Sequence, residues 1–360
     1  MLTLLDKIDK ISKENTELVE SCFLCGSADT KFLFWNFDRL NHLPGKFGLI
    51  QCERCQLVRL SPRPLKNNLS FYYPEEDYYS YQSPTASINN LSSRGLVSEI
   101  RKKIRQIVFN HLGYSNEKLS FLEQLFQPFL VKLLFEQATY GWGKRFPPYK
   151  KDGFALDIGC GNGSYLSFLK HYGWKVQGVD LSQKAADVAK GNFDIDVFVG
   201  KIEDLAFPPE SFDYVNMSHV LEHVFDPLET MKKVKTLLKK NGSIYIEVPN
   251  YKSYSRKISK QYWYAWETPR HLYTFSPENL KELLEAAGFE VVEINTKVEN
   301  LFAWDNTYKY EEKEGLKSER PFVTATDKPK LLFQALSARI SHLFNRSSGD
   351  FICCWANSKG

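Results

Sequence analysis

One stretch, FALDIGCGNG at positions 154–163, restricts the possible folds of this chain more than any other. It predicts a short buried strand, a turn with glycine at three alternate positions, and a helix over 165–171. Glycine has no Cβ and tolerates positive φ, so Gly159, Gly161 and Gly163 allow the backbone to approach a ligand closely. A strand that leads through such a loop into a helix is a common nucleotide-binding arrangement.

The glycine spacing and two nearby acids narrow the choice of ligand. The pattern is G-x-G-x-G, whereas dinucleotide-binding proteins have G-x-G-x-x-G. Asp157 ends the first strand, and no Lys or Arg lies between positions 156 and 168, which favours a cationic ammonium over a pyrophosphate. Asp180 ends a second predicted strand, 174–180, where a carboxylate can accept both hydroxyls of a ribose. An adenosine with an amino-acid tail in place of phosphates is S-adenosylmethionine (SAM).

These residues resemble class I SAM-dependent methyltransferases. In that family the L-D-I-G-C-G-x-G stretch holds the methionyl part of SAM, and the acid that ends the second strand holds the ribose. The family commonly has an acid after the glycine of the third-strand loop, where this chain has Lys201, so only Ile202 and Glu203 are carried over there. The cofactor-binding residues that the resemblance implies are Asp157, Gly159, Gly161, Gly163, Asp180, Ile202, Glu203 and Ser218.

Two C-x-x-C pairs near the N-terminus predict a metal site. A chain without a predicted secretion signal favours metal ligation over disulfides for such pairs. Four thiolates satisfy tetrahedral Zn²⁺ with no open position, so we expect a structural site rather than a catalytic one. Strand-like alternation at 31–35 and 47–51 completes a zinc ribbon. The predicted ligands are Cys22, Cys25, Cys52 and Cys55.

The stretch that follows the second pair, up to position 64, strengthens the resemblance. Many methyltransferases encoded with bacterial sugar and surface-polysaccharide pathways begin with a similar ribbon that ends in C-x-x-C-x-L-V-x-x-x-P-R-P. This resemblance implies methyl transfer to a hydroxyl of a sugar, a nucleotide-sugar or a lipid-linked glycan. C- or N-methylation of a deoxysugar and methylation of a quinone-like lipid or other small molecule stay open as alternatives.

The pattern along the chain predicts three parts. Residues 1–64 hold an N-terminal helix (1–20) and the ribbon, 65–150 a tyrosine-rich cover segment and a helical linker, and 151–360 the SAM-binding domain with an unassigned insertion at 296–349. Alternating strands and helices predict a doubly wound, Rossmann-like α/β sheet of seven strands, and the resemblance implies an antiparallel last strand. The further predicted strands are 196–199, 212–217, 243–248, 290–294 and 351–355, and the helices are 182–190, 227–240 and 276–287.

Candidate catalytic residues follow the fourth and fifth strands, because substrates bind beyond the carboxyl ends of strands in open α/β sheets. His219, Glu222 and His223 share one face at i, i+3, i+4 spacing and offer a general base, a structural contact or divalent-metal ligands. A second group, Arg270 and His271, follows an aromatic run suited to stacking on a sugar or base. Arg suits a phosphate, and we expect His223 or His271 as the base. A structural lid over SAM is the alternative for this second group.

Composition and charge limit the partners. A net charge of +4 and a basic cluster confined to 94–105 do not favour nucleic acid, so a zinc-ribbon nucleic-acid-binding protein with a degenerate SAM fold is only an alternative. The glycine spacing disfavours a NAD-dependent oxidoreductase. No apolar signal or membrane-spanning run is found, which predicts a cytoplasmic enzyme. The basic helix from Arg94 to Arg105 is either a solvated face or a peripheral contact with the inner face of the membrane.

Overall fold

The computed structural model describes residues 15–73, 96–115, 117–138, 145–298 and 328–359. Contacts divide the chain into two compact units, one of residues 1–76, 218–235 and 246–359 and the other of residues 77–217 and 236–245. Most of the predicted N-terminal helix, most of the tyrosine-rich segment, Arg94 and the middle of the 296–349 insertion lie outside the described residues. The predicted division into three parts stays a prediction.

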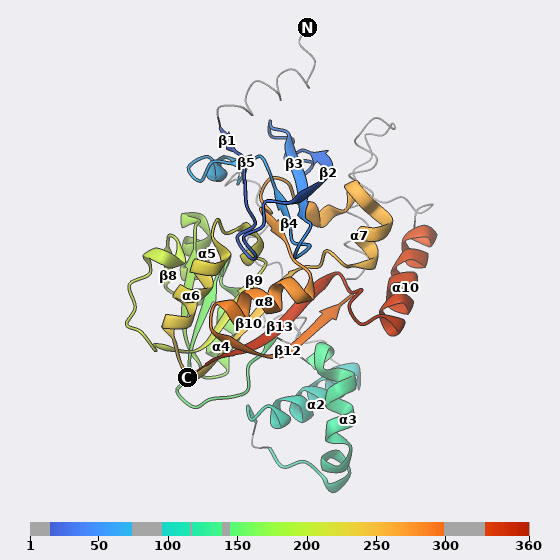
Figure 1. Ribbon diagram of the computed structural model, residues 1–360. Coiled ribbons are helices and arrows are strands. Elements are labelled where there is room, and N and C mark those ends of the chain that lie inside the picture. Colours follow the sequence, from blue (N-terminus) through green and yellow to red (C-terminus); the bar gives the residue numbers. More distant parts are fainter. Residues whose placement is uncertain (1–14, 74–95, 116, 139–144, 299–327, 360) are drawn as a thin grey trace. The chain divides into compact units, whose positions relative to one another are not determined.

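A seven-stranded sheet carries the glycine loop, with strand order β12-β13-β10-β9-β6-β7-β8 (Figure 1). Strand β6 pairs in parallel with both β7 and β9, β7 pairs in parallel with β8, and β12 and β13 are antiparallel. This order and the antiparallel last strand confirm the predicted doubly wound class I methyltransferase fold. The strands are β6 (Phe154–Ile158), β7 (Lys175–Asp180), β8 (Val197–Val199), β9 (Phe212–Ser218), β10 (Leu238–Pro249), β12 (Phe289–Lys297) and β13 (Phe351–Ser358).

Two of the helices that follow strands begin at side-chain caps. The Ser182 hydroxyl accepts a hydrogen bond from the backbone of Ala185, and Ser276 forms a capping box with Asn279. Both caps satisfy backbone N–H groups that have no partner within the helix. The helices are α4 (Ser164–His171), α5 (Gln183–Phe193), α6 (Pro227–Leu237) and α8 (Pro277–Ala286).

The predicted helix 227–240 is wrong in its last three residues. Helix α6 ends at Leu237, and Leu238 begins β10. The carbonyls of Thr236 and Leu237 accept hydrogen bonds from the backbone of Glu210 and Ser211, so they do not bond to a further helical turn. The shorter elements are η1 (Leu69–Tyr72), η5 (Ile202–Asp204), η6 (Leu221–His223), α7 (Tyr254–Ser259), η7 (Lys260–Tyr262) and η8 (Tyr264–Trp266), and α10 spans Lys328–Phe344.

Two helices, α2 (Leu96–His111) and α3 (Phe121–Ala138), form a hairpin in which they pack side by side (Figure 1). Val108 and Val131 form its core, and Lys103 Nζ lies 2.9 Å from Glu123 Oε1. Gly113, at φ 81°, lies in the turn between the helices. The region predicted as a helical linker thus contains two helices. Of the helices described, none is long and apolar enough to cross a membrane. Contact with a membrane surface stays a prediction.

The N-terminal region forms a four-stranded antiparallel sheet with order β11-β4-β3-β2. Strand β3 has five of its six residues buried, which suits a strand in the middle of a small core. The sheet includes β11 from far along the chain, paired through Tyr273 and Arg59. A separate pair, β1 and β5, makes residues 16–17 a strand rather than the end of the predicted helix 1–20. The strands are β1 (Thr16–Glu17), β2 (Thr30–Asn36), β3 (Phe47–Cys52), β4 (Val58–Leu60), β5 (Arg63–Pro64) and β11 (Tyr273–Thr274).

Candidate functional site

The glycine loop has the backbone conformation that its sequence predicts. Gly159, Gly161 and Gly163 all have positive φ, at 70°, 52° and 77°. A Cβ at Gly163 would lie 2.7 Å from the Cβ of Ala189, so this position excludes any side chain on steric grounds as well. The loop between the end of β6 and the start of α4 therefore has three positions at which no side chain covers the backbone.

Asp157 is a buried acid near the end of β6 that accepts a hydrogen bond from a side chain. The amide nitrogen of Asn216, in β9, donates to Asp157 Oδ1 at 2.5 Å. Burial raises the pKa of Asp157 to about 7, and the hydrogen bond from Asn216 lowers it only in part. A cation beside this carboxylate would hold it ionised. Asn216 was not predicted, because nothing in the β9 sequence distinguishes it from a core position.

Asp180 connects the end of β7 to the glycine loop. Its Oδ2 accepts a hydrogen bond from the backbone of Gly161 at 2.9 Å, and its Oδ1 accepts one from the backbone of Ser182 at 3.0 Å. Burial nevertheless raises the pKa of this carboxyl. The structure thus brings together Asp157, the loop glycines and Asp180 in one unit.

The other predicted cofactor contacts lie on neighbouring elements. Ile202 is buried in η5 and Glu203 is exposed there. Ser218 is the half-buried last residue of β9. Their contacts with SAM, like the ribose contact of Asp180, stay predictions.

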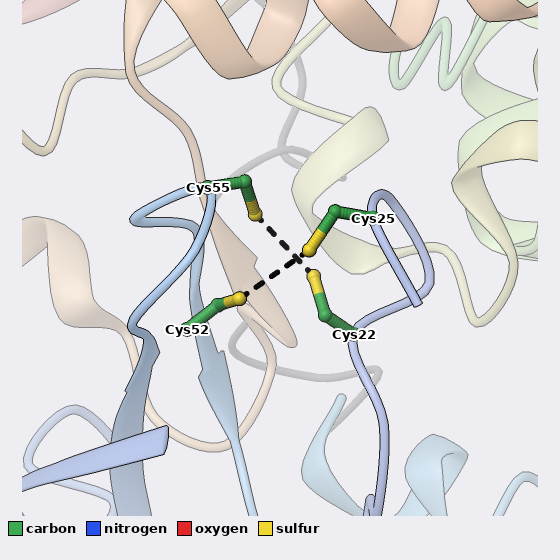
Figure 2. A group of neighbouring side chains, drawn as sticks. All are labelled: Cys22, Cys25, Cys52 and Cys55. Atoms are coloured by element: carbon green, nitrogen blue, oxygen red, sulfur yellow. Dashed lines mark hydrogen bonds between the residues drawn. The ribbon is translucent and has the colours of Figure 1, made fainter. Parts of the chain in front are cut away.

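The four predicted cysteines form one cluster, shown in Figure 2. The Sγ atoms of Cys22 and Cys55 are 3.5 Å apart, those of Cys25 and Cys52 are 3.4 Å apart, and none forms a disulfide. Four sulfurs around a tetrahedral Zn²⁺, at a Zn–S distance of about 2.3 Å, would be about 3.8 Å apart. The four-cysteine cluster therefore fits a closed tetrahedral metal site.

A second cluster gathers side chains from two distant segments. The ligand atoms of Glu222, His223 and His271 all lie within 4.8 Å of one another, and we call this group the acid–histidine cluster. Glu222 and His223 belong to η6, which begins three residues after the last residue of β9, and His271 precedes β11. The sequence prediction had placed these residues in two separate groups.

Each histidine of the cluster has its Nδ1 beside a backbone carbonyl. His271 Nδ1 lies 2.8 Å from the carbonyl oxygen of Ala265, and His223 Nδ1 lies 3.1 Å from that of Arg270. Because a carbonyl only accepts, the contact of His271 assigns its hydrogen to Nδ1 and leaves Nε2 with a lone pair. His223 Nδ1 also lies 2.8 Å from the hydroxyl of Tyr73, which can donate or accept, so the contacts of His223 fit either tautomer. Burial lowers the pKa of each imidazole to about 4. A neutral imidazole can accept a proton or bind a metal.

His219 differs from the other two histidines. Its Nδ1 lies 3.4 Å from Glu222 Oε1 and its Nε2 lies 3.3 Å from Glu247 Oε1. Burial acts to lower its pKa, but the two carboxylates outweigh burial and raise it to about 9. Because 37% of the side chain is exposed, water screens part of this attraction. A cationic His219 neutralises the buried acids and is not suited to act as a base.

Arg270 is fully buried, and its guanidinium is occupied by protein groups. It donates to both carboxylate oxygens of Asp38 at 2.9 and 3.1 Å, to Glu267 at 3.0 Å and to the carbonyl of Tyr72 at 3.0 Å. The prediction that it binds a substrate phosphate is therefore not favoured by this placement. Arg270 instead fixes the backbone carbonyl to which His223 is bonded.

The aromatic run before Arg270 also packs inward. Trp263 and Trp266 are buried against each other, with ring centroids 5.2 Å apart, and each indole N–H has a partner. Phe34 of β2 packs edge-on against Trp266. The indoles of Trp263 and Trp266 are therefore part of the core and do not form an exposed surface for stacking.

Comparisons with known proteins agree with this fold. Residues 136–294 match the family model described as "Methyltransferase domain". The chain is 27% identical over 181 residues to a ubiquinone biosynthesis O-methyltransferase of Coxiella burnetii, covering 47% of this chain and 73% of that protein. It is 31% identical over 160 residues to the protein of that name from Cereibacter sphaeroides, covering 41% of this chain and 65% of the other.

A solved SAM-dependent methyltransferase from Archaeoglobus fulgidus is 22% identical and covers 66% of this chain and 100% of its own, with a TM-score of 0.41. The sheet order, rather than this resemblance, identifies the fold. The family match and the curated relatives support a SAM-dependent methyltransferase domain in this chain.

Proposed function

We propose that this protein transfers a methyl group from SAM to a hydroxyl of a sugar, a nucleotide-sugar or a lipid-linked glycan. The main support for SAM as the cofactor is the glycine loop with two buried carboxylates beside it, Asp157 and Asp180. The ammonium of the methionyl group supplies the cation that Asp157 needs to stay ionised near neutral pH. Asp180 has the position from which a carboxylate accepts ribose hydroxyls in such sheets.

The chemistry is an in-line displacement in which the acceptor oxygen attacks the methyl carbon and SAM leaves as S-adenosylhomocysteine (SAH). An acceptor hydroxyl must also lose its proton. We assign that task to the acid–histidine cluster, because it holds two neutral imidazoles beside a carboxylate. This assignment keeps the sequence-based choice of His223 or His271 and gives His219 a charge-neutralising role.

The proposal includes a structural Zn²⁺ held by Cys22, Cys25, Cys52 and Cys55. Its support is a cluster of four free thiols whose sulfurs are spaced for tetrahedral coordination. All four positions around the metal are filled by protein, so this Zn²⁺ would stabilise the fold and take no part in methyl transfer.

A quinone-like phenol is the second candidate acceptor, because the curated relatives are ubiquinone biosynthesis O-methyltransferases. Transfer of a labelled methyl group from SAM to parallel panels of nucleotide-sugars, lipid-linked glycans and hydroxylated quinone precursors separates the two. We expect label in a carbohydrate product. Label only in the phenolic panel would replace the carbohydrate proposal by the quinone one.

A further inference from the structure

Helix α3 of the hairpin packs against α2 on one side and is exposed on its other sides. Val131 forms a core with Val108 of α2, and the Gln127 side chain donates a hydrogen bond to the carbonyl of Ile107 at 3.1 Å. Six large apolar side chains on the other sides of α3 are 52–78% exposed. They recur at intervals of three or four residues, so they form one continuous surface. They are Phe121, Leu122, Leu125, Phe126, Phe129 and Leu133, and we call them the α3 apolar face.

The α3 apolar face is large for a surface that stays in water. A helix that is apolar on all sides is normally buried on all sides. Each of the six side chains leaves about 100 Å² uncovered, or about 600 Å² in one copy, at the upper end of the apolar patches found on soluble monomers. The only charged side chain described in α3, Glu123, is paired with Lys103 of α2 at 2.9 Å. The surface therefore favours contact with a second apolar surface.

This surface lies outside the part of the chain that matches the methyltransferase family. The match begins at residue 136, whereas the α3 apolar face ends at Leu133. The glycine loop and the acid–histidine cluster both belong to later parts of the chain. A role for the α3 apolar face is therefore independent of the proposed function.

We propose that the α3 apolar face binds the same face of a second copy of this chain, so that two hairpins form a four-helix bundle. The two copies would together bury about 1,200 Å² of apolar surface, which reaches the size of specific, stable interfaces. Two helical hairpins that share one apolar core are a common arrangement of four helices. A two-fold axis brings identical residues close to each other, which apolar side chains tolerate and like charges do not.

The charges beside the α3 apolar face favour a protein partner over an anionic membrane. Binding to such a membrane is strengthened by cations along the edge of an apolar surface. Here the edge carries both signs, because Lys103 pairs with Glu123, and the exposed acid Glu99 lies one helical turn from Lys103. The basic cluster of α2 is thus partly neutralised. A mixed polar rim around an apolar centre is typical of protein–protein interfaces.

Sedimentation equilibrium of the full-length, zinc-loaded protein between about 1 and 50 µM tests the interface. We expect the wild type to have twice the mass of one chain. Phe129→Glu should weaken the dimer at least about 100-fold, because the two-fold symmetry places two new like charges in an apolar contact. Phe333→Glu is the matched control, since Phe333 of α10 is 70% exposed and Phe129 is 64% exposed. The control should keep the dimer affinity within about threefold.

A wild type that is monomeric at about 50 µM, or a folded Phe129→Glu that dimerises like the wild type, would overturn the inference. Circular dichroism establishes that the variants fold, and Leu125→Glu replaces Phe129→Glu if the latter does not. Dissociation by Phe333→Glu alone would assign the dimer to α10. A monomeric wild type that floats with phosphatidylserine vesicles would assign the α3 apolar face to a membrane. Calorimetric SAM binding in the same samples is a separate readout, and its absence would reject only the proposed function.

Discussion

Asp157 connects the charge of the cofactor to the pH dependence of its binding. Its pKa in the unliganded protein is raised to about 7, while an ammonium partner requires the ionised form. Below pH 7 binding must therefore release a proton. We expect the Kd for SAM to rise by up to about tenfold per pH unit as pH falls from 7 to 5.

The amino group of SAM stays protonated across this range, so the change reports on the protein. Asp157→Asn should bind SAM weakly and without this slope. A Kd that is constant between pH 5 and 7 in the wild type would contradict the pairing. Isothermal calorimetry at several pH values measures both.

We expect the free energy of unfolding to depend on pH through the buried imidazole of His271. Its pKa in the folded protein is lowered to about 4 by burial, against about 6.5 when unfolded. The unfolded chain therefore binds more protons between these values, and stability falls as pH decreases from about 6.5 to 4. For this residue the slope is at most about 1.4 kcal/mol per pH unit.

Urea unfolding of the wild type and of His271→Gln at pH 7 and 5 isolates this contribution. The variant should lose less stability than the wild type on acidification. Equal losses would show that His271 is not held neutral in the folded state.

We expect the loss of the buried ion pair between Arg270 and Asp38 to lower the stability of the fold strongly. Both side chains are 0% exposed, so removal of one charge leaves the other without its main partner. We expect Asp38→Asn to lower the free energy of unfolding by about 3 kcal/mol. Glu278→Gln, which breaks an exposed pair with Lys252, should lower it by less than about 1 kcal/mol. Denaturant unfolding of both variants gives the comparison, and similar losses would refute the structural role of Asp38.

At the scale of elements, the four-cysteine cluster supports the segment that carries His271. Strand β11 begins two residues after His271 and pairs with β4 of the ribbon sheet, and Asn279 donates a hydrogen bond to the carbonyl of Cys55 at 2.7 Å. Loss of the metal should therefore loosen both the ribbon and the acid–histidine cluster.

We expect zinc chelation to lower the melting temperature by about 5–10 °C, since a structural site contributes several kcal/mol. Re-addition of Zn²⁺ should restore it. If the metal-free protein melts at the original temperature, zinc does not stabilise the fold.

The sequence predicts elements well where the signal is local. The glycine loop, the strand before it and the helix after it all depend on residues within a few positions of one another. Strand β11 was not predicted, because two residues carry no periodicity and their pairing with β4 is long-range. The end of α6 was placed wrongly for the same reason, since backbone groups of Glu210 and Ser211 bond to its last carbonyls.

At the scale of the whole molecule, the sequence predicts the fold class and the family of the cofactor-binding loop, but only part of the acid–histidine cluster. Glu222 and His271 are 49 positions apart, and only the folded chain brings their side chains to 3.9 Å. The inward packing of Trp263 and the ion pair of Arg270 are likewise tertiary, so residue type alone suggested substrate contacts for both.

The central claim, that the chain binds SAM at the Asp157–Asp180 loop, is tested most directly by calorimetric titration with SAM, SAH and NAD in parallel. We predict saturable one-to-one binding of SAM and SAH, no heat from NAD, and loss of the SAM signal in folded Asp157→Ala and Asp180→Ala. If the protein binds neither SAM nor SAH, or if both variants bind SAM with unchanged affinity, the claim that SAM binds at this loop is wrong.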